Sequence, residues 1–254
     1  MCGRYAAGRG PEELVRLFGV RDWDPEQAPG PDWNVAPTKP VSAVLERPSP
    51  GGGPQPVRQL RTLRWGLVPS WSKSPEGAVK MINARAETVH QKPAYRQAFA
   101  ARRCLLPADG YYEWAVAAAD PGAPRAKARK QPYLIAPADG SVLAMAGLYE
   151  FWRDRAVPAE DPAAWWCTCT VVTTAAEPAL AAIHDRMPLV LPPDRWDAWL
   201  DPALADPEQA RLLLAPPPPG LLAARPVSAA VGSVRNNGPE LLHPAEPETP
   251  LQLF

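Results

Sequence analysis

The sequence predicts an α+β fold: a single mixed domain built on a curved, barrel-like, mainly antiparallel sheet with peripheral helices. Three observations support this class. The 254 residues suffice to bury one sizeable core, and many short runs read as strands. Strands and long helices do not succeed each other regularly, which argues against a doubly wound parallel sheet.

The N-terminal half contains one well-marked helix. PEELVRLFG (11–19) predicts a short helix, because Pro11 suits its first turn and Gly19 its end. RPSPGGGPQP (47–56) predicts a loop. The other elements expected in this half are strands at 41–46 and 57–65 and a helix at 94–102.

The C-terminal half begins with CLLPADGYYEW (104–114), which predicts two strands joined by a turn at Ala108-Asp109-Gly110. A connector rich in proline, alanine and lysine follows at 117–131. Beyond it we expect strands at 133–136, 141–152 and 165–173 and helices at 177–184 and 193–200. One domain is predicted over 1–243, followed by a loose tail over 244–254.

The charge balance excludes a protein that holds long DNA by charge alone. Twenty-seven basic residues balance 27 acidic ones, whereas such proteins are usually basic. The charge balance does not exclude a small arginine-lined site that binds a few phosphates. The chain lacks a signal-peptide pattern and a long apolar run, so we expect no membrane association and a cytoplasmic protein, bound to the nucleoid when it acts on DNA.

The four cysteines are expected to be reduced thiols. No C-x-x-C pair is present and the three histidines are scattered, so we expect neither a structural zinc site nor another cofactor.

Cys2 offers unusual chemistry, because removal of Met1 exposes an amine and a thiol on adjacent carbons. The α-amino group has an ordinary pKa of about 7.7–8.0, so part of it is nucleophilic near neutral pH. The amine can condense with an aldehyde, and the thiol can then close a thiazolidine ring. Gly3 permits close backbone approach, and Arg4 offers a phosphate-binding fork. The alternative is a small buried residue near a terminus.

Two further polar groups lie in strand-like segments. In INARAET (82–88), an extended chain would point Asn83, Arg85 and Glu87 to one side, as a lined cleft or as a solvated strand face. Glu113 stands between Tyr112 and Trp114, where a buried carboxyl suits a general acid. The alternative is an exposed glutamate.

His184 ends a helical pattern in HDRMP, with Arg186 close by as a phosphate ligand. A structural histidine is the alternative to a proton-transfer role. Asp185 either orients the histidine or pairs with Arg186. Trp65 and Trp71 flank a Gly/Pro turn and are candidates for stacking on bases or for core packing.

Seven motifs in order resemble the SRAP (SOS response-associated peptidase) family of YedK-like proteins that process abasic sites. They are MCGRY (1–5), WNVAPT (33–38), WGLVPSW (65–71), INARAET (82–88), ADGYYEW (108–114), TTAAEPALAAIHDRMPLVL (173–191) and VSAAVGSVRNNGPEL (227–241). The resemblance covers nearly the whole chain and implies a mixed domain around a barrel-like sheet.

The resemblance also implies roles for nine residues. Cys2 is expected to form a covalent thiazolidine crosslink to an abasic site in single-stranded DNA, with Asn83 holding the sugar or the cysteine backbone. Glu113 is expected to act as acid and base and His184 to assist proton transfer. The implied DNA-binding residues are Arg4, Trp71, Arg85, Thr173 and Arg186. Some relatives carry a second tryptophan where this chain has Ser72.

The resemblance implies that the partner is single-stranded DNA containing abasic sites. We expect a monomer, because nothing in the sequence demands an assembly. The resemblance further implies that the protein removes its own Met1 by a peptidase activity and has a weak lyase side reaction through the imine. Two other functions are compatible with the residues: an N-terminal-cysteine hydrolase of the amidotransferase kind, in which the thiolate attacks a carbonyl, and a noncovalent single-strand binding module.

Overall fold

The computed structural model describes residues 2–49, 55–116 and 130–246. The expected connector at 117–131 and the expected tail at 244–254 therefore lie largely outside the described residues. At their edges, Lys130 and Gln131 begin a strand, and Pro244 forms an isolated bridge with Val227.

Five strands close into a barrel, which confirms the predicted fold class. They are β3 (Pro40–Arg47), β4 (Val57–Trp65), β6 (Arg103–Ala108), β9 (Leu143–Arg153) and β10 (Trp165–Ala175). The ring closes because β10 pairs with β9 on one side and with β4 on the other. The β4–β10 pairing is parallel, and the other pairings of the ring are antiparallel.

The alternation of side chains along these strands builds two cores. Val44, Leu105 and Ala144 face a cluster shared with the helices, whereas their neighbours Leu45 and Leu106 belong to a second cluster. Successive side chains of a strand point to opposite faces, so the second cluster fills the barrel interior. The N-terminal segment enters this interior, because Cys2 and Tyr5 are members of the same cluster.

A second, antiparallel sheet of five strands lies against the barrel. Its order is β12 (Leu222–Pro226), β8 (Lys130–Pro137), β7 (Gly110–Val116), β1 (Tyr5–Ala7) and β2 (Asp32–Val35). The expected turn at Ala108-Asp109-Gly110 is present, but it makes no hairpin. It carries the chain from β6 in the barrel to β7 in the second sheet.

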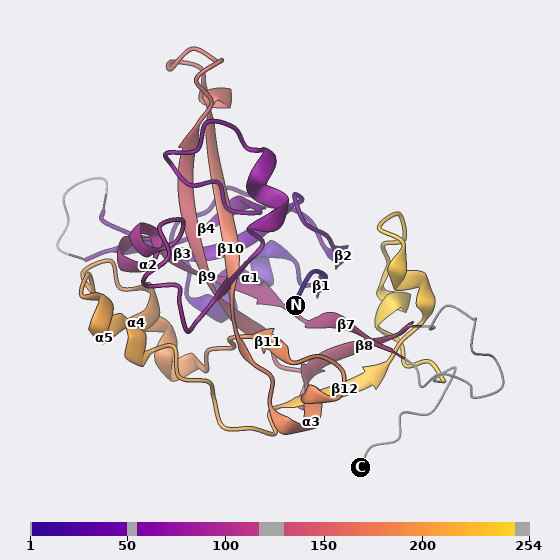
Figure 1. Ribbon diagram of the computed structural model, residues 1–254. Helices are drawn as coiled ribbons and strands as arrows, with labels where there is room; N and C mark the ends of the chain where they lie inside the picture. The colour runs from indigo at the N-terminus through magenta and orange to yellow at the C-terminus, as the bar shows by residue number, and fades with distance from the viewer. Residues whose placement is uncertain (1, 50–54, 117–129, 247–254) are drawn as a thin grey trace.

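Two short strands extend one end of β10. β5 (Asn83–Arg85) runs parallel to it and β11 (Arg186–Pro188) antiparallel. At the opposite end, β9 and β10 project from the barrel as a long hairpin, drawn at the top of Figure 1. The strand β10 therefore connects two distant parts of the surface.

The helices are short and lie outside the sheets (Figure 1). They are α1 (Pro11–Phe18), α2 (Arg96–Ala101), α3 (Pro178–Ala181), α4 (Trp196–Leu200) and α5 (Pro207–Leu212), with 3-10 turns η1 (Glu76–Lys80), η2 (Pro162–Ala164), η3 (Pro193–Arg195), η4 (Ala229–Gly232) and η5 (Pro239–Leu242). α1 begins at Pro11 and ends before Gly19 in the left-handed conformation, as predicted. The helix predicted over 177–184 is shorter, and the one over 193–200 is divided between η3 and α4.

No helix in the described part of the chain is long and apolar enough to cross a bilayer.

Candidate functional site

Cys2 is buried in the cluster that fills the barrel interior, and Gly3 and Arg4 separate it from β1. Its side chain is 0% exposed and shares an apolar cluster with Tyr5, Trp65 and Met187. Burial raises the pKa of its thiol well above the ordinary value, and the negative charge of Glu113 raises it further. The thiol is therefore protonated near neutral pH.

Asn83 holds the backbone of this cysteine. The Asn83 Nδ2 group donates a hydrogen bond of 2.8 Å to the carbonyl oxygen of Cys2. Asn83 itself is fixed from two sides: β5 pairs it with Val171, and the Tyr95 hydroxyl donates to its carbonyl oxygen at 3.2 Å. The amide therefore anchors the residue next to the chain start.

Glu113 approaches from the second sheet. Tyr5 of β1 pairs with Tyr111 of β7, and the Tyr112 N–H donates to the carbonyl oxygen of Arg4. Continued by two residues, this register sets Glu113 opposite Gly3. Its side chain is 5% exposed, so the structure excludes the alternative of an exposed glutamate. The site thus combines a thiol and a carboxyl from neighbouring segments of the second sheet, the thiol just before β1 and the carboxyl on β7.

His184 lies between α3 and β11 with its Nδ1 atom in contact with two groups. The backbone N–H of Arg186 donates to Nδ1 at 2.9 Å, and a carboxylate oxygen of Asp185 lies at the same distance. Nδ1 cannot accept a hydrogen bond from the Arg186 N–H and donate one to the Asp185 carboxylate at the same time. Neutral His184 therefore carries its proton on Nε2, whereas protonation favours the contact with Asp185. Its neighbour Ile183 packs against the cluster that contains Cys2.

Arg186 is engaged by the protein itself. Its two terminal nitrogens donate to the carboxylate of Glu87 at 2.6 and 3.0 Å, and Nη2 also donates to the Thr173 carbonyl oxygen at 2.7 Å. The hydroxyl of Thr173 is 3.4 Å from Nη2, and the Thr173 side chain is buried. A phosphate would therefore meet Arg186 in competition with Glu87.

The predicted row of Asn83, Arg85 and Glu87 is only partly present. Asn83 and Arg85 share one face of β5, with Ala84 buried between them and Arg85 exposed. The strand ends at Arg85, where the chain turns, so the prediction that Glu87 continues the row is wrong. Arg85 pairs with Thr173 in the sheet and lies beside the Arg186 group.

Arg4 is held between the second sheet and the C-terminal segment. Its Nη1 atom donates to Asn34 Oδ1 at 2.7 Å and to the Val231 carbonyl oxygen at 2.9 Å, and the guanidinium lies 5.9 Å from the Trp114 ring centre. Burial lowers the pKa of Arg4, although an arginine remains charged in proteins.

The two candidate tryptophans have different environments. Trp65 is fully buried, meets Tyr5 edge to face and donates from Nε1 to the Ile82 carbonyl oxygen, so it is a core residue. Trp71 is 63% exposed and is available for stacking. Gly66 makes the turn between them at φ 126°, where a side chain would come within 2.7 Å of the Ala78 carbonyl oxygen.

Sequence reasoning missed three residues near the site. Asn34 is fully buried and its amide donates to three carbonyl oxygens of the segment 231–236. Tyr111 and Glu177 are buried nearby, and the charges of Cys2, Glu113 and Glu177 all raise the pKa of Tyr111, after burial itself. A signal was available for Asn34, because it is a polar residue between the apolar Trp33 and Val35.

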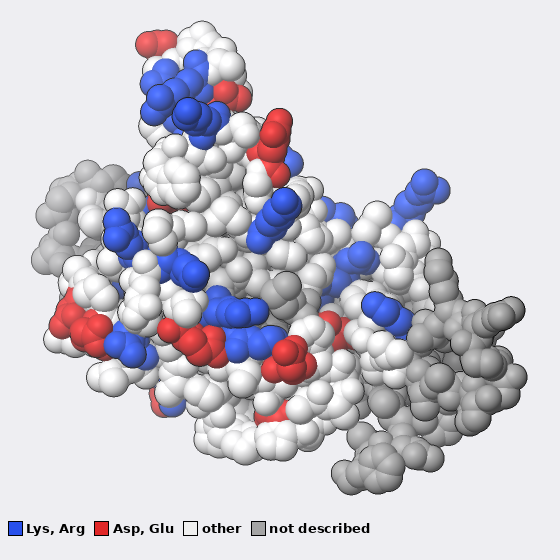
Figure 2. All heavy atoms as spheres, in the orientation of Figure 1, with Lys and Arg blue, Asp and Glu red and all other residues white. Residues whose placement is uncertain are grey.

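Basic side chains surround the face that carries β1, β5 and β11, mixed with acidic ones (Figure 2). Within the described residues, no group of three or more histidine, cysteine or acidic side chains has the spacing of a metal site. The geometry thus provides a buried thiol with an anchored backbone, a buried carboxyl, and exposed cations nearby.

Comparisons with known proteins place the chain in a family. The family described as SOS response associated peptidase (SRAP) matches residues 1–234. The chain is 36% identical to the abasic site processing protein YoqW of Bacillus subtilis, over 95% of this chain and 99% of that protein. It is 32% identical to YedK of Escherichia coli, over 96% and 100% of the two chains, and 31% identical to HMCES of Gallus gallus, over 100% and 80%.

Solved structures show the same fold. A Bacteroides thetaiotaomicron protein aligns with a TM-score of 0.74 at 23% identity, over 96% of this chain and all of the other. A Bordetella bronchiseptica protein aligns with a TM-score of 0.67 at 28% identity, over 89% and 100%. On the family match and the extent of these similarities, the chain belongs to the SRAP family.

Proposed function

We propose that this protein processes abasic sites by forming a covalent crosslink between Cys2 and the lesion in single-stranded DNA. The similar proteins named abasic site processing proteins support the general activity. The observation that supports the covalent form is the position of Cys2. A residue next to the chain start is fully buried, its carbonyl oxygen is held by Asn83, and the charge of Glu113 acts on its thiol.

The reaction requires a free α-amine on Cys2, so Met1 must first be removed by hydrolysis. We include removal by the protein itself in the proposal, because the family is described as a peptidase. The mass of protein made in cells and in a purified translation system tests this step. Retention of Met1 in the purified system would assign the removal to another enzyme.

The crosslink then forms in three balanced steps. Glu113 moves a proton from the anomeric hydroxyl to the ring oxygen, which opens the sugar to its aldehyde. The amine adds to the aldehyde carbon and water leaves, giving an imine. The thiol adds across the C=N bond, its proton goes to nitrogen, and the thiazolidine closes. His184, with the proton on Nε2, assists these transfers.

Strand cleavage is the competing path. An imine acidifies the neighbouring carbon, so loss of the 3′ phosphate by β-elimination is a weak lyase reaction in this scheme. Ring closure by the thiol removes the imine and limits that loss. We expect Cys2→Ser to retain the amine while closing the ring less readily, and therefore to cleave more and crosslink less than the native protein.

The decisive experiment mixes the protein with an abasic oligonucleotide and analyses the products on a denaturing gel. Native protein and Cys104→Ser are expected to give a shifted band that survives denaturation, whereas Cys2→Ala gives none. Cys104 is the matched control because it is another buried free cysteine, on β6. A shift seen only on native gels would support noncovalent binding, and glutaminase activity would support the amidotransferase alternative.

A further inference from the structure

A groove outside the Cys2 site lies where the start of β10 meets the end of β4. Its volume is about 370 Å³. The residues that line it are Thr38, Pro40, Thr62, Leu63, Arg64, Ala163, Trp165, Trp166 and Cys167. Within this described lining, Arg64 carries the single formal charge and no carboxylate is present. The groove therefore favours an anionic ligand.

The groove also presents aromatic surface. Trp165 is 53% exposed although tryptophan is usually buried. The guanidinium of Arg64 lies 4.7 Å from the ring centre of Trp166 and covers it. The exposed indole of Trp165 lies opposite Arg153 on β9 and shares the groove lining with Arg64. An exposed indole with arginines nearby is the combination with which proteins bind single-stranded nucleic acid, because bases stack on the ring and the cation meets a phosphate.

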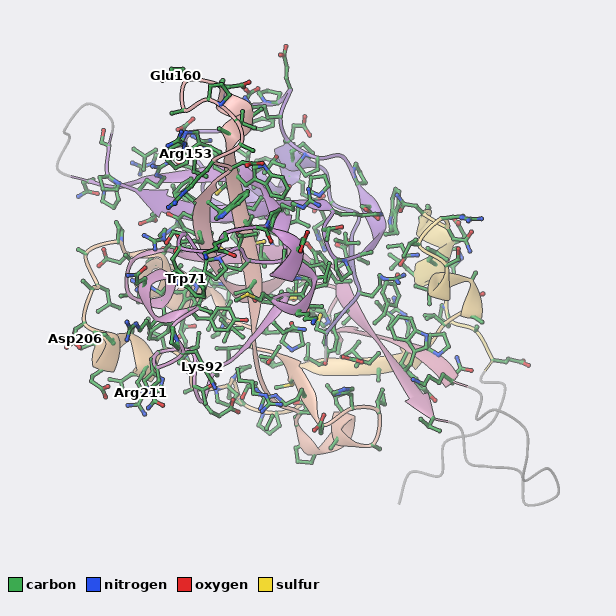
Figure 3. The ribbon with its side chains drawn as sticks, turned by 45° about the horizontal axis from the view of Figure 1, so that its top comes forward. Trp71, Lys92, Arg153, Glu160, Asp206 and Arg211 are labelled. Atoms are coloured by element: carbon green, nitrogen blue, oxygen red, sulfur yellow. The ribbon has the colours of Figure 1, made fainter. Side chains whose placement is uncertain are left out.

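The projecting hairpin supplies further cations beside the groove. Arg153 pairs with Trp165 across the two strands, and Arg155 is exposed in the turn that follows. Figure 2 shows basic side chains gathered over this hairpin, apart from those around β11 and β1. In Figure 3, Arg153 and Glu160 mark the hairpin. The acidic Asp154 and Asp161 of the hairpin accept backbone hydrogen bonds from the turn.

Contacts connect the groove with the Trp71 loop. Trp152 meets Trp166 edge to face at 5.5 Å and donates from Nε1 to the Ser72 carbonyl oxygen at 2.7 Å. The loop that carries exposed Trp71 is thus fixed against the base of the hairpin. Within the described residues, two exposed indoles, Trp71 and Trp165, therefore lie next in sequence to residues of this contact, Ser72 and Trp166.

The strand β10 also sets the distance to the crosslinking site. Asn83, which holds Cys2, pairs with Val171, six residues from Trp165 on the same strand. At about 3.3 Å per residue this is roughly 20 Å. At about 3.4 Å per stacked nucleotide, the same span corresponds to about six nucleotides.

We propose that this groove is a second contact for single-stranded DNA, in which a base on one side of the lesion stacks on Trp165 while Arg64 and Arg153 meet its phosphates. The inference rests on the proposed function, since it names where the flanking strand binds. It predicts a contact that short oligonucleotides cannot reach from the Cys2 site.

The test compares Trp165→Ala and Arg64→Gln with the native protein on two abasic oligonucleotides. One has arms of about two nucleotides on each side of the lesion and the other arms of about ten. We expect both variants to bind the long oligonucleotide at least about fivefold more weakly and to crosslink the short one at the native rate. Fluorescence anisotropy and denaturing gels give the two readouts.

Leu212→Ala and Arg211→Gln are the matched controls, because both residues are exposed on α5. They are expected to leave both readouts unchanged. Equal thermal midpoints of all variants verify that the fold is intact.

The outcomes separate this inference from the proposed function. If both variants bind the long oligonucleotide with native affinity, the proposal that the groove binds DNA is overturned. It is also overturned if the variants lose affinity equally for the short and the long oligonucleotide. If the native protein binds the long oligonucleotide without crosslinking, and Trp165→Ala weakens that binding, the groove is supported while the covalent function fails. A native protein that binds no DNA overturns both.

Discussion

Arg186 of β11 donates two hydrogen bonds to the carboxylate of Glu87, which lies in the turn directly after β5, the strand that carries Asn83. This planar pairing is the geometry with which an arginine binds a phosphate. Half of the Glu87 side chain is exposed, whereas Arg186 is mostly covered. Under the proposed function, a DNA phosphate would compete with the Glu87 carboxylate for Arg186.

Replacing Glu87 by Gln tests this competition. The neutral amide no longer competes electrostatically for Arg186, so we expect the affinity for single-stranded DNA to rise by about two- to tenfold at low salt. The salt dependence of binding is expected to steepen by about one released counterion. Anisotropy over a salt series measures both effects. Weaker binding at all salt concentrations would instead show that Glu87 positions Arg186 for the phosphate.

The same ion pair predicts a pH effect. The hydrogen bond that the Glu87 carboxylate accepts from Arg186 holds the pKa of Glu87 below the ordinary value. The stabilisation is therefore present above about pH 4.3, the ordinary pKa of glutamate, and is lost as the pH falls through the lower folded value. Glu87→Gln is expected to reduce the loss of thermal stability between about pH 5 and pH 3. An unchanged profile would contradict a contribution of this pair.

Replacing Asn83 by Asp tests the anchor on Cys2. The carboxylate has nearly the same shape but cannot donate to the Cys2 carbonyl oxygen, which is 2.8 Å from the native amide nitrogen. The lost bond and the added repulsion are expected to slow crosslinking by about 10- to 100-fold. Binding of undamaged DNA should change less than threefold, roughly. Time courses on a denaturing gel give the rate, and an unaltered rate would remove Asn83 from the site.

The sequence predicted the barrel-like fold class and the strands that form the barrel, because side-chain alternation and turn residues are local signals. Val44, Leu45, Leu105 and Leu106 alternate between two clusters just as a period of two requires. The end of β5 was not predicted, because the turn after Arg85 contains no glycine or proline. It is fixed by long-range contacts, including the hydrogen bond from the Ala86 N–H to the Thr173 carbonyl oxygen.

Long-range contacts also determine the environment of those site residues for which the local sequence left two alternatives. Trp65 and Trp71 flank the same turn, yet only Trp65 meets Tyr5 and enters the barrel. Asn34 bonds to residues about 200 positions away, which no local pattern reveals. Glu113 is buried because the chain leaves the barrel after β6, at Asp109, and the following strand β7 pairs with β1 in the second sheet.

The buried thiols predict a loss of stability at alkaline pH. Burial raises the pKa of all four cysteines, to about 12 for Cys167. Above an ordinary pKa of about 8.5, the unfolded chain releases protons that the folded chain retains. Stability is therefore full below that pH and falls above it, by about 1.4 kcal/mol per pH unit for each thiol.

Thermal or urea unfolding between about pH 7 and pH 10 measures this slope. Cys169→Ala is expected to reduce the slope by about a quarter while lowering stability at neutral pH through lost packing. A slope that is the same in the variant would show that the Cys169 thiol ionises equally in the folded and unfolded chains.

Arg103, on β6, connects the helices α2 and α4 to the barrel through its guanidinium. It is 3% exposed and donates five hydrogen bonds of 2.6–3.0 Å to the carbonyl oxygens of Phe99, Ala100, Trp199, Asp201 and Leu204. Arg103→Met leaves these acceptors unsatisfied and is expected to cost about 3–5 kcal/mol. Arg103→Lys, with three donors, should cost less. Urea unfolding measures both, with exposed Arg211→Met as a control expected within about 0.5 kcal/mol of native. A cost below about 1 kcal/mol for Arg103→Met would show that water replaces the guanidinium at these carbonyls, and the ends of α2 and α4 would then be stabilised by apolar packing alone.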